Sequence, residues 1–310
     1  MNVVLVVVGL AGLYLGGELL VRSASSLARA LGISPMVIGL TVVAFGTSAP
    51  ELAATLVAAF RGAPELAIAN VVGSNIANIG LILGLTALAY PLATSGAFLR
   101  REVPWMLAAT ALAIPLLFDG RLGRIEGLVL WTALAVFLVA AFRSGGLPGE
   151  VDVVGVAPIG ARRWPMRDVL AVVAGVAVLA YGAHALVTGA TALATAWGVP
   201  ERVIGLTLVA LGTSLPELAS SLVAALRRET DIILGNVIGS NLFNLLAVLG
   251  TAAFVHPIEV PVGGLRLDLL IMLGFALAVV PLMLVGRRLG RRDGALLLVA
   301  YLTYVGWLFI

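Results

Sequence analysis

The chain consists of apolar runs of about 20 residues that follow one another almost from end to end. A helix of that length crosses about 30 Å of hydrocarbon, the thickness of a bilayer core. The composition agrees, because 61% of the residues are hydrophobic and only 11% are charged, too few to cover the surface of a soluble protein. We therefore expect an all-α polytopic membrane protein with ten transmembrane helices. The expected spans are 2–21, 35–60, 66–90, 103–118, 125–142, 168–190, 202–226, 232–255, 267–286 and 294–310.

All 19 basic residues are arginines, and their positions predict how the spans are oriented. The loops after the odd-numbered spans hold 14 of them, and the opposite side holds 5. Because positive charge favours the cytoplasmic side, we expect both termini to be extracellular and the protein to lie in the cell (cytoplasmic) membrane. The segment 143–167, rich in Gly, Pro and Arg, is expected to be a cytoplasmic linker between the halves 1–142 and 168–310.

The partners expected from this composition are the lipid bilayer and small ions. Short arginine-bearing loops are topology signals rather than a nucleic-acid surface, and no protein partner is evident. The chain contains no cysteine, which excludes disulfides and thiolate metal sites. We expect no resident cofactor and no enzymatic activity, because no cluster of nucleophile, base and orienting group appears.

An internal repeat covers the most polar parts of the apolar runs. Residues 39–78 match residues 205–244 at a constant offset of 166, with 23 of 40 positions identical. Since each half holds five expected spans, an odd number, the second copy must cross the membrane in the opposite direction to the first. Two inverted-topology five-helix repeats are typical of transporters, with the binding site near the membrane midplane where the halves meet.

The repeat carries "GTSAPE" at 46–51 and "GTSLPE" at 212–217. In a helix, Thr47, Ser48 and Glu51 can share one face. Pro50 should break that helix and free carbonyls around residues 44–46, which survive at membrane depth only if they line a cavity or are otherwise satisfied. The second copy repeats this arrangement with Thr213, Ser214, Pro216 and Glu217.

A second motif adds more oxygens. "NVVGSNIAN" (70–78) and "NVIGSNLFN" (236–244) place Ser74 with Asn78, and Ser240 with Asn244, on common helix faces. Carboxylate, hydroxyl, amide and carbonyl oxygens suit Ca²⁺ and alkali ions rather than zinc or copper. Two glutamates carry a charge that one divalent or two monovalent cations would neutralise. Mutually exclusive occupancy of that kind is what ion exchange requires.

These paired motifs resemble the two alpha-repeats of the sodium/calcium exchangers of the cation/calcium antiporter superfamily, in its prokaryotic form without a regulatory domain. The resemblance implies Na⁺/Ca²⁺ antiport with Glu51 and Glu217 as ligands of calcium and of sodium. It also implies a set of sodium ligands, namely Thr47, Ser48, Thr213, Ser214, Ser74 and Ser240 with the carbonyls of Ala44 and Ala210. Asn78 matches the usual asparagine, whereas archaeal relatives carry an aspartate where this chain has Asn244, which removes a possible third carboxylate.

Two other functions stay open at this point. One is an antiporter that exchanges H⁺, or another cation, for Ca²⁺, because protons should compete for two carboxylates that share a pocket. The other is a passive cation channel, for which a continuous pore lined by carbonyl or charge rings is expected.

Several polar residues outside the motifs also have expected roles. We expect Glu18 to pair with Arg22 one helical turn away, and Glu65, Glu102, Asp231 and Asp268 to be solvated residues at span edges. We expect the motif asparagines to brace broken helices rather than bind ions; these are Asn70, Asn75, Asn236 and Asn241.

Overall fold

The structure is a computed structural model that describes residues 2–144, 166–199, 210–260 and 262–308. The described chain is helical apart from turns and four two-residue strands, as expected of apolar segments that must satisfy their backbone groups internally in lipid. The elements of the first half are α1 (Asn2–Leu31), α2 (Pro35–Ile38), the π-helical turn η1 (Gly39–Val43), α3 (Ala44–Thr47), α4 (Ala49–Phe60), α5 (Pro64–Ala77), the π-helical turn η2 (Asn78–Leu83), α6 (Gly84–Ala89), β1 (Leu92–Ala93), α7 (Gly96–Phe118), β2 (Arg121–Leu122) and α8 (Arg124–Ser144). Those of the second half are α9 (Met166–Ala196), α11 (Ala210–Gly212), α12 (Leu215–Leu226), α13 (Thr230–Phe243), the π-helical turn η4 (Asn244–Val248), α14 (Leu249–Val255), β3 (Ile258–Glu259), α15 (Val262–Leu284), the 3₁₀ turn η5 (Val285–Arg287), β4 (Arg288–Leu289) and α16 (Arg291–Trp307).

The lengths of the helices confirm a multi-span membrane protein. Within the described residues, seven helices are long and apolar enough to cross a membrane, and an eighth crossing results if the bent pair Pro35–Thr47 and Ala49–Phe60 is one span. Most of the expected linker 143–167 lies outside the described residues.

Several helices are longer than the apolar runs that predict them. The span expected at 2–21 belongs to a helix that continues to Leu31 and stops at Gly32, whose φ is +67°. The span expected at 103–118 belongs to a helix that begins at Gly96, where the Ser95 hydroxyl accepts the Phe98 amide at 3.0 Å. Hydropathy marks the part of a helix that lies in lipid, whereas caps and left-handed residues mark its ends.

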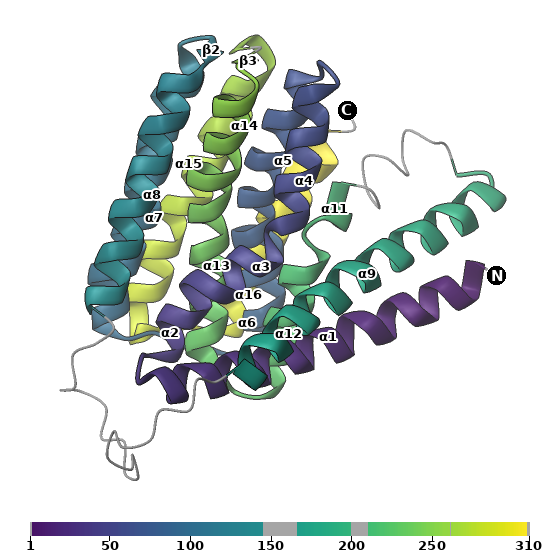
Figure 1. Cartoon of the computed structure of the whole chain (residues 1–310), viewed down its shortest axis with the longest axis vertical. Coiled ribbons are helices and arrows are strands. Elements are labelled where there is room, and N and C mark those ends of the chain that lie inside the picture. Colours follow the sequence, from purple (N-terminus) through teal and green to yellow (C-terminus); the bar gives the residue numbers. More distant parts are fainter. Residues whose placement is uncertain (1, 145–165, 200–209, 261, 309–310) are drawn as a thin grey trace.

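The centre of the bundle is the segment formed by α13, η4 and α14 (Figure 1). The whole apolar window of this segment is buried, whereas only a third of the corresponding window of α15 is buried. The second motif of the C-terminal half therefore lies in the interior, away from lipid.

α1 and α9 lie side by side across one flank of the bundle (Figure 1). Their backbones approach closely because glycines face one another: a Cβ added at Gly182 would lie 2.7 Å from the Leu13 amide nitrogen, and one added at Gly16 would lie 2.7 Å from that of Leu179. Small residues allow such close approach of membrane helices.

The offset of 166 residues recurs in the backbone of the turns. Six of the seven described residues with positive φ fall into pairs at this separation, with Arg287 left over. In one pair Arg228 takes the place that glycine holds in the other half. The pairs are Gly32 with Gly198, Gly62 with Arg228, and Gly120 with Gly286.

Two short antiparallel ribbons join the halves. β1 pairs with β4, with Leu92 opposite Leu289, and β2 pairs with β3, with Leu122 opposite Ile258. Each ribbon therefore links one loop of the first half to one loop of the second.

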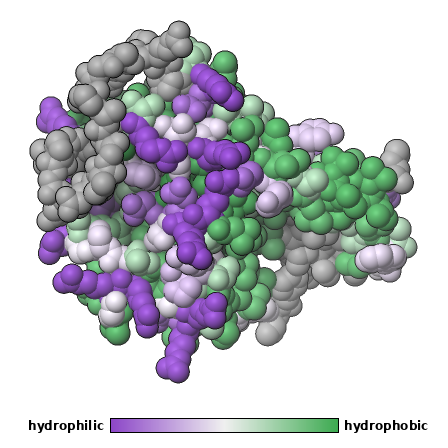
Figure 2. Space-filling view, turned by 90° about the horizontal axis from the view of Figure 1, so that it is seen from below, coloured by the Kyte–Doolittle hydropathy of each residue, from purple (hydrophilic) through white to green (hydrophobic). Residues whose placement is uncertain are grey.

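Hydrophilic side chains gather on the end of the bundle that is drawn at the bottom of Figure 1, as the view from below in Figure 2 shows. α1 ends at this face, where Arg22 and Arg29 are exposed. We refer to this face as the arginine-rich end.

Candidate functional site

Two broken helices place the motif glutamates in the interior. α3 ends at Thr47, Ser48 breaks the helix with φ −82° and ψ 4°, and α4 then begins, with a bend of 43° between the two parts. Glu51 lies in the first turn of α4 and is 1% exposed. Pro50 lies in the same turn, where a helix needs no donor from it. A carboxylate there also faces the positive end of the helix dipole.

The second half builds the same corner. Ser214 has φ −87° and ψ 3°, and Glu217 lies in the first turn of α12 and is 1% exposed. Ser48 and Ser214 both hold the N-cap position, yet neither side chain caps its own helix.

The serine hydroxyls instead donate across the interface between the halves. Ser48 Oγ donates to Glu217 Oε1 at 3.1 Å, and Ser214 Oγ donates to Glu51 Oε1 at 3.2 Å. Ser214 Oγ also lies 3.5 Å from Ser74 Oγ. The structure therefore brings the two carboxylates and three predicted hydroxyls into one reciprocal cluster.

Several buried polar atoms of the two motifs have no hydrogen-bond partner among the described residues. Such atoms cost several kcal/mol each in an apolar interior unless another group satisfies them. The set includes Glu51 Oε2, Glu217 Oε2, Thr213 Oγ1, Ser240 Oγ and both side-chain amide atoms of Asn78 and Asn244. Unpaired oxygens from both halves are thus available to a cation.

Asn78 and Asn244 occupy a local structure that the sequence did not predict. Each is the first residue of a π-helical turn, η2 in the first half and η4 in the second. π-helical turns are frequent at functional sites. Hydrophobic periodicity does not reveal them, and the only sequence signal is that both asparagines end the repeated motif.

Thr47 and the carbonyl of Ala44 have protein partners. Thr47 Oγ1 donates to Asn236 Oδ1 at 3.2 Å and lies 3.4 Å from the Ala44 carbonyl. That carbonyl also accepts the Ser48 amide at 3.0 Å. The prediction that Pro50 frees it is wrong, because a missing amide at residue 50 removes the bond to residue 46; a second lone pair still leaves a carbonyl able to bind a cation.

The second-half counterparts of these two residues are Thr213 and Ala210. Ala210 is the first residue of α11, and Thr213 lies in the turn between α11 and α12. Residues 200–209, which precede them, are outside the described ranges.

Two motif asparagines brace the broken helices, as predicted. Asn70 Nδ2 donates to the Glu51 carbonyl at 3.2 Å and to Thr55 Oγ1 at 2.9 Å, which fixes α4 against α5. Asn236 Nδ2 lies 3.2 Å from the hydroxyls of Ser220 and Ser221, which fixes α12 against α13.

For the other two asparagines the bracing prediction is wrong. Asn75 and Asn241 each donate at 2.8 Å to a carbonyl one turn earlier in their own helix. The side-chain nitrogen is therefore satisfied within its own helix, whereas Asn75 Oδ1 is buried without a partner among the described residues.

The predicted pair of Glu18 with Arg22 is also wrong. Glu18 forms its ion pair with Arg227, which follows α12, and its Oε2 accepts from Nε at 2.7 Å. This hydrogen bonding raises the pKa of the Arg227 guanidinium above its ordinary value. Tertiary packing of α1 against α12 brings a better partner than the neighbour one turn away.

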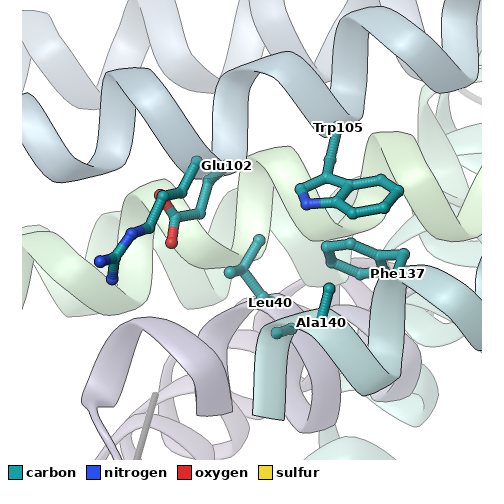
Figure 3. Close-up of a pocket in the computed structure, with 7 residues that line it drawn as sticks. Leu40, Glu102, Trp105, Phe137 and Ala140 are labelled. Carbon is teal, nitrogen blue, oxygen red and sulfur yellow. The ribbon is translucent and has the colours of Figure 1, made fainter. Parts of the chain in front are cut away.

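Two of the acids predicted to be solvated are held by the protein. Glu102 is half-buried in a small pocket beside Leu40, across from Trp105 and Phe137, whose rings meet edge to face at 5.8 Å (Figure 3). Asp268 accepts the Tyr304 hydroxyl at 2.9 Å. Glu65 and Asp231 are exposed, as predicted.

No group of three or more His, Cys, Asp or Glu side chains that could hold a metal occurs in the described ranges. The cluster at the helix breaks instead combines two carboxylates with neutral oxygens. The fold and this interior site define a multi-span membrane protein with a buried, oxygen-lined centre.

Comparison with known proteins identifies the family. The sodium/calcium exchanger protein family matches residues 1–143 and 168–310, and the chain belongs to it. Its members are transporters, and the chain is accordingly membrane-located.

Individual relatives match over nearly their whole length. The protein CaxA of Alkalimonas amylolytica is 39% identical over 314 residues, covering 99% of this chain and 98% of that protein. The sodium/calcium exchanger MaX1 of Methanosarcina acetivorans is 33% identical over 344 residues, covering 99% and 98%. Among solved structures, the sodium-calcium exchanger NCX_Mj soaked with 10 mM Na⁺ and zero Ca²⁺ matches with a TM-score of 0.86 at 30% identity, covering 98% of each chain.

Proposed function

We propose that this protein is a secondary active antiporter that exchanges Na⁺ for Ca²⁺ across the cytoplasmic membrane. The observation that carries the proposal is the pair of buried carboxylates, Glu51 and Glu217, each with one oxygen bonded to a serine of the other half and one oxygen without a partner among the described residues. No basic side chain among the described residues pairs with either glutamate. The side chains that donate hydrogen bonds to them are the uncharged hydroxyls of Ser214 and Ser48. Two carboxylates in an apolar interior are stable together only if bound cations or protons offset their charge.

The substrates follow from the chemistry of the ligands. Oxygen donors of mixed charge suit Ca²⁺ and Na⁺, and the formal charge of the glutamate pair is balanced by one calcium or by two sodium ions. Competition for one pair of carboxylates couples the two ions, since calcium can bind only where sodium has left. The proposed ligands are Glu51, Glu217, Thr47, Ser48, Thr213, Ser214, Ser74, Ser240, Asn78 and Asn244, with the carbonyls of Ala44 and Ala210.

The proposal includes the membrane topology, ten spans in two inverted repeats, 1–142 and 168–310, with both termini outside. Three contacts support it, because each joins loops that this topology puts on the same side. The β1–β4 ribbon joins the loops after spans 3 and 9, and the β2–β3 ribbon joins those after spans 4 and 8. The pair of Glu18 and Arg227 joins the ends of spans 1 and 7.

Alternating access is proposed to come from movement of α1 and α9 over the fixed site. These two helices pack mainly on each other through glycines, and the four segments that carry the site pack on one another in the bundle. Because glycines hold α1 and α9 close to each other, the two helices can move together relative to the bundle while the carboxylates stay in place.

The test is uptake of ⁴⁵Ca²⁺ into proteoliposomes loaded with Na⁺ and diluted into choline, with Glu51→Gln and the exposed-site variant Glu65→Gln alongside. We expect uptake that needs internal Na⁺, is lost in Glu51→Gln and persists in Glu65→Gln. Uptake that follows an imposed pH gradient without Na⁺ would instead establish proton exchange. Calcium flux without any counter-ion would establish a channel, and full activity of Glu51→Gln would overturn the site.

A further inference from the structure

The two halves differ in side-chain charge at one pair of equivalent positions, residue 18 on α1 and residue 184 on α9. Glu18 on α1 is paired with Arg227, which follows α12. At an offset of 166 residues, the place of Glu18 is taken by His184 on α9 and that of Arg227 by Arg61, which follows α4. One of these two equivalent pairings therefore combines an acid with a base, and the other combines two basic residues. Both His184 and Arg61 are exposed.

The packing of α1 and α9 differs in the same sense. Leu20 and Val21, at the arginine-rich end of α1, are 0% exposed. Their counterparts on α9, Leu186 and Val187, are only half-buried. α1 packs along α12, whereas α4 is not among the main described partners of α9. The arginine-rich end is thus the more tightly closed of the two.

We propose that Glu18 and Arg227 form a latch that holds the arginine-rich end closed, and that the protein favours this state because the equivalent latch at His184 and Arg61 is missing. The inference rests on the proposed alternating-access function. Since the halves share one fold in opposed orientations, an exchange of their conformations gives the second state. In that state α9 packs on α4 as α1 now packs on α12, and His184 meets Arg61. An imidazole, neutral or charged, supplies no countercharge for a guanidinium.

The size of the bias follows from the exposure of the pair. The two side chains are 31% and 30% exposed, so water and salt screen their attraction. Measured energies of such pairs correspond to a change of roughly two- to five-fold in the ratio of the two states.

The natural absence of cysteine allows the two ends to be labelled at matched positions. Ala30 and Leu226 are exposed at the arginine-rich end, and their repeat counterparts, Ala196 and Phe60, are exposed at the other. Spin labels on cysteines at either pair report the separation of α1 from α12 or of α9 from α4. Double electron–electron resonance spectroscopy in lipid nanodiscs then gives the shares of short and long distances between the two labels at each end.

The variants are Glu18→Gln, which removes the latch, and His184→Glu, which builds the second one. We expect Glu18→Gln to raise the ratio of long to short Ala30–Leu226 distances roughly two- to five-fold. His184→Glu should raise the short-distance share of the Ala196–Phe60 pair by a similar factor. Glu259→Gln, an exposed acid on β3, is the matched control and should change neither.

Distance distributions of Glu18→Gln and His184→Glu that match those of Glu259→Gln would overturn the latch. If Glu18→Gln does not fold, His184→Glu still decides, because it adds a pair without removing one. Calcium uptake is measured on the same preparations. Shifted distances without any calcium uptake support the latch and contradict the exchanger, whereas normal sodium-driven uptake with unshifted distances contradicts only the latch.

Discussion

Replacing one motif glutamate with glutamine tests the site at the level of binding, independently of transport. Glutamine has the shape of glutamate and keeps an oxygen that can accept the hydroxyl of Ser214 or Ser48, so the hydrogen bonds of 3.2 Å and 3.1 Å survive in Glu51→Gln and Glu217→Gln. The formal charge of the pair falls by half. Any loss of ion binding then reports the charge rather than the fold.

The expected loss is large because both carboxylates are 1% exposed. Two unit charges 4 Å apart attract by about 4 kcal/mol at an effective dielectric constant of 20, and a divalent ion doubles this to about 8 kcal/mol. Desolvation offsets part of that attraction. If about 4 kcal/mol remains, either glutamine variant binds Ca²⁺ roughly 1,000-fold more weakly than the parent protein.

The assay is thermal unfolding of purified protein in detergent, with and without CaCl₂. A ligand at 100 times its Kd that binds only the folded state adds about 2.7 kcal/mol of stability, so calcium should raise the Tm of the parent protein and of the control Glu65→Gln. At the same calcium concentration the Tm of Glu51→Gln and of Glu217→Gln should not move. A calcium-induced rise in either variant equal to that of the parent would refute the reasoning.

Three other predictions concern the carboxylate hydrogen bonds, the contact of α1 with α9, and residue 244. Ser48→Ala and Ser214→Ala each remove a proposed ligand oxygen that also donates to a carboxylate of the other half. Loss of one polar contact worth about 1.5–3 kcal/mol in the bound state should weaken calcium binding roughly 10- to 100-fold, to a similar degree in both variants. Titration calorimetry that finds only one of them impaired would contradict the reciprocal arrangement. Gly182→Leu adds a side chain at a position where even a Cβ would lie 2.7 Å from a backbone nitrogen of α1, so it should abolish uptake in proteoliposomes. Gly306→Leu, at a position with open space around it, should not. Asn244→Asp adds a titratable group to a buried site and should change the sodium dependence or pH sensitivity of uptake more than its maximal rate; a profile identical to the parent would place residue 244 outside the site.

The repeated motifs named the residues that the structure joins across the halves, Glu51, Glu217, Ser48, Ser214 and Ser74, but not how they pair. Helical spacing placed Thr47, Ser48 and Glu51 on one face, as three ligands from one half. In the structure the helix breaks at Ser48, which turns its hydroxyl toward Glu217. Thr47 turns toward Asn236. A helix break changes the direction of the side chains by an angle that residue spacing does not reveal. The side-chain contacts between the halves therefore could not be predicted from the sequence.

The same limit explains the errors outside the site. Glu18 was matched to Arg22 because helical spacing reveals only neighbours one turn away. In the structure α1 packs against α12, and this brings Arg227, the residue after α12, to Glu18. Glu102 was expected at the edge of the span 103–118, yet α7 begins about two turns before that span, at Gly96, and carries Glu102 into a pocket beside Leu40. Hydropathy predicts which segments lie in lipid, and partners for single polar groups depend on how helices cross.

The distribution of differences between the halves fits the proposed exchange. The bonds made directly to the carboxylates are matched: Ser48 and Ser214 donate reciprocally, and Asn78 and Asn244 both begin π-helical turns. Away from them the halves diverge, as at Glu18 and its counterpart His184. An exchanger must offer its ions the same ligands whichever side the site faces, because different ligands would trap an ion on one side. The gates have no such requirement, so asymmetry at the ends of α1 and α9 can set the resting state without altering the ion site.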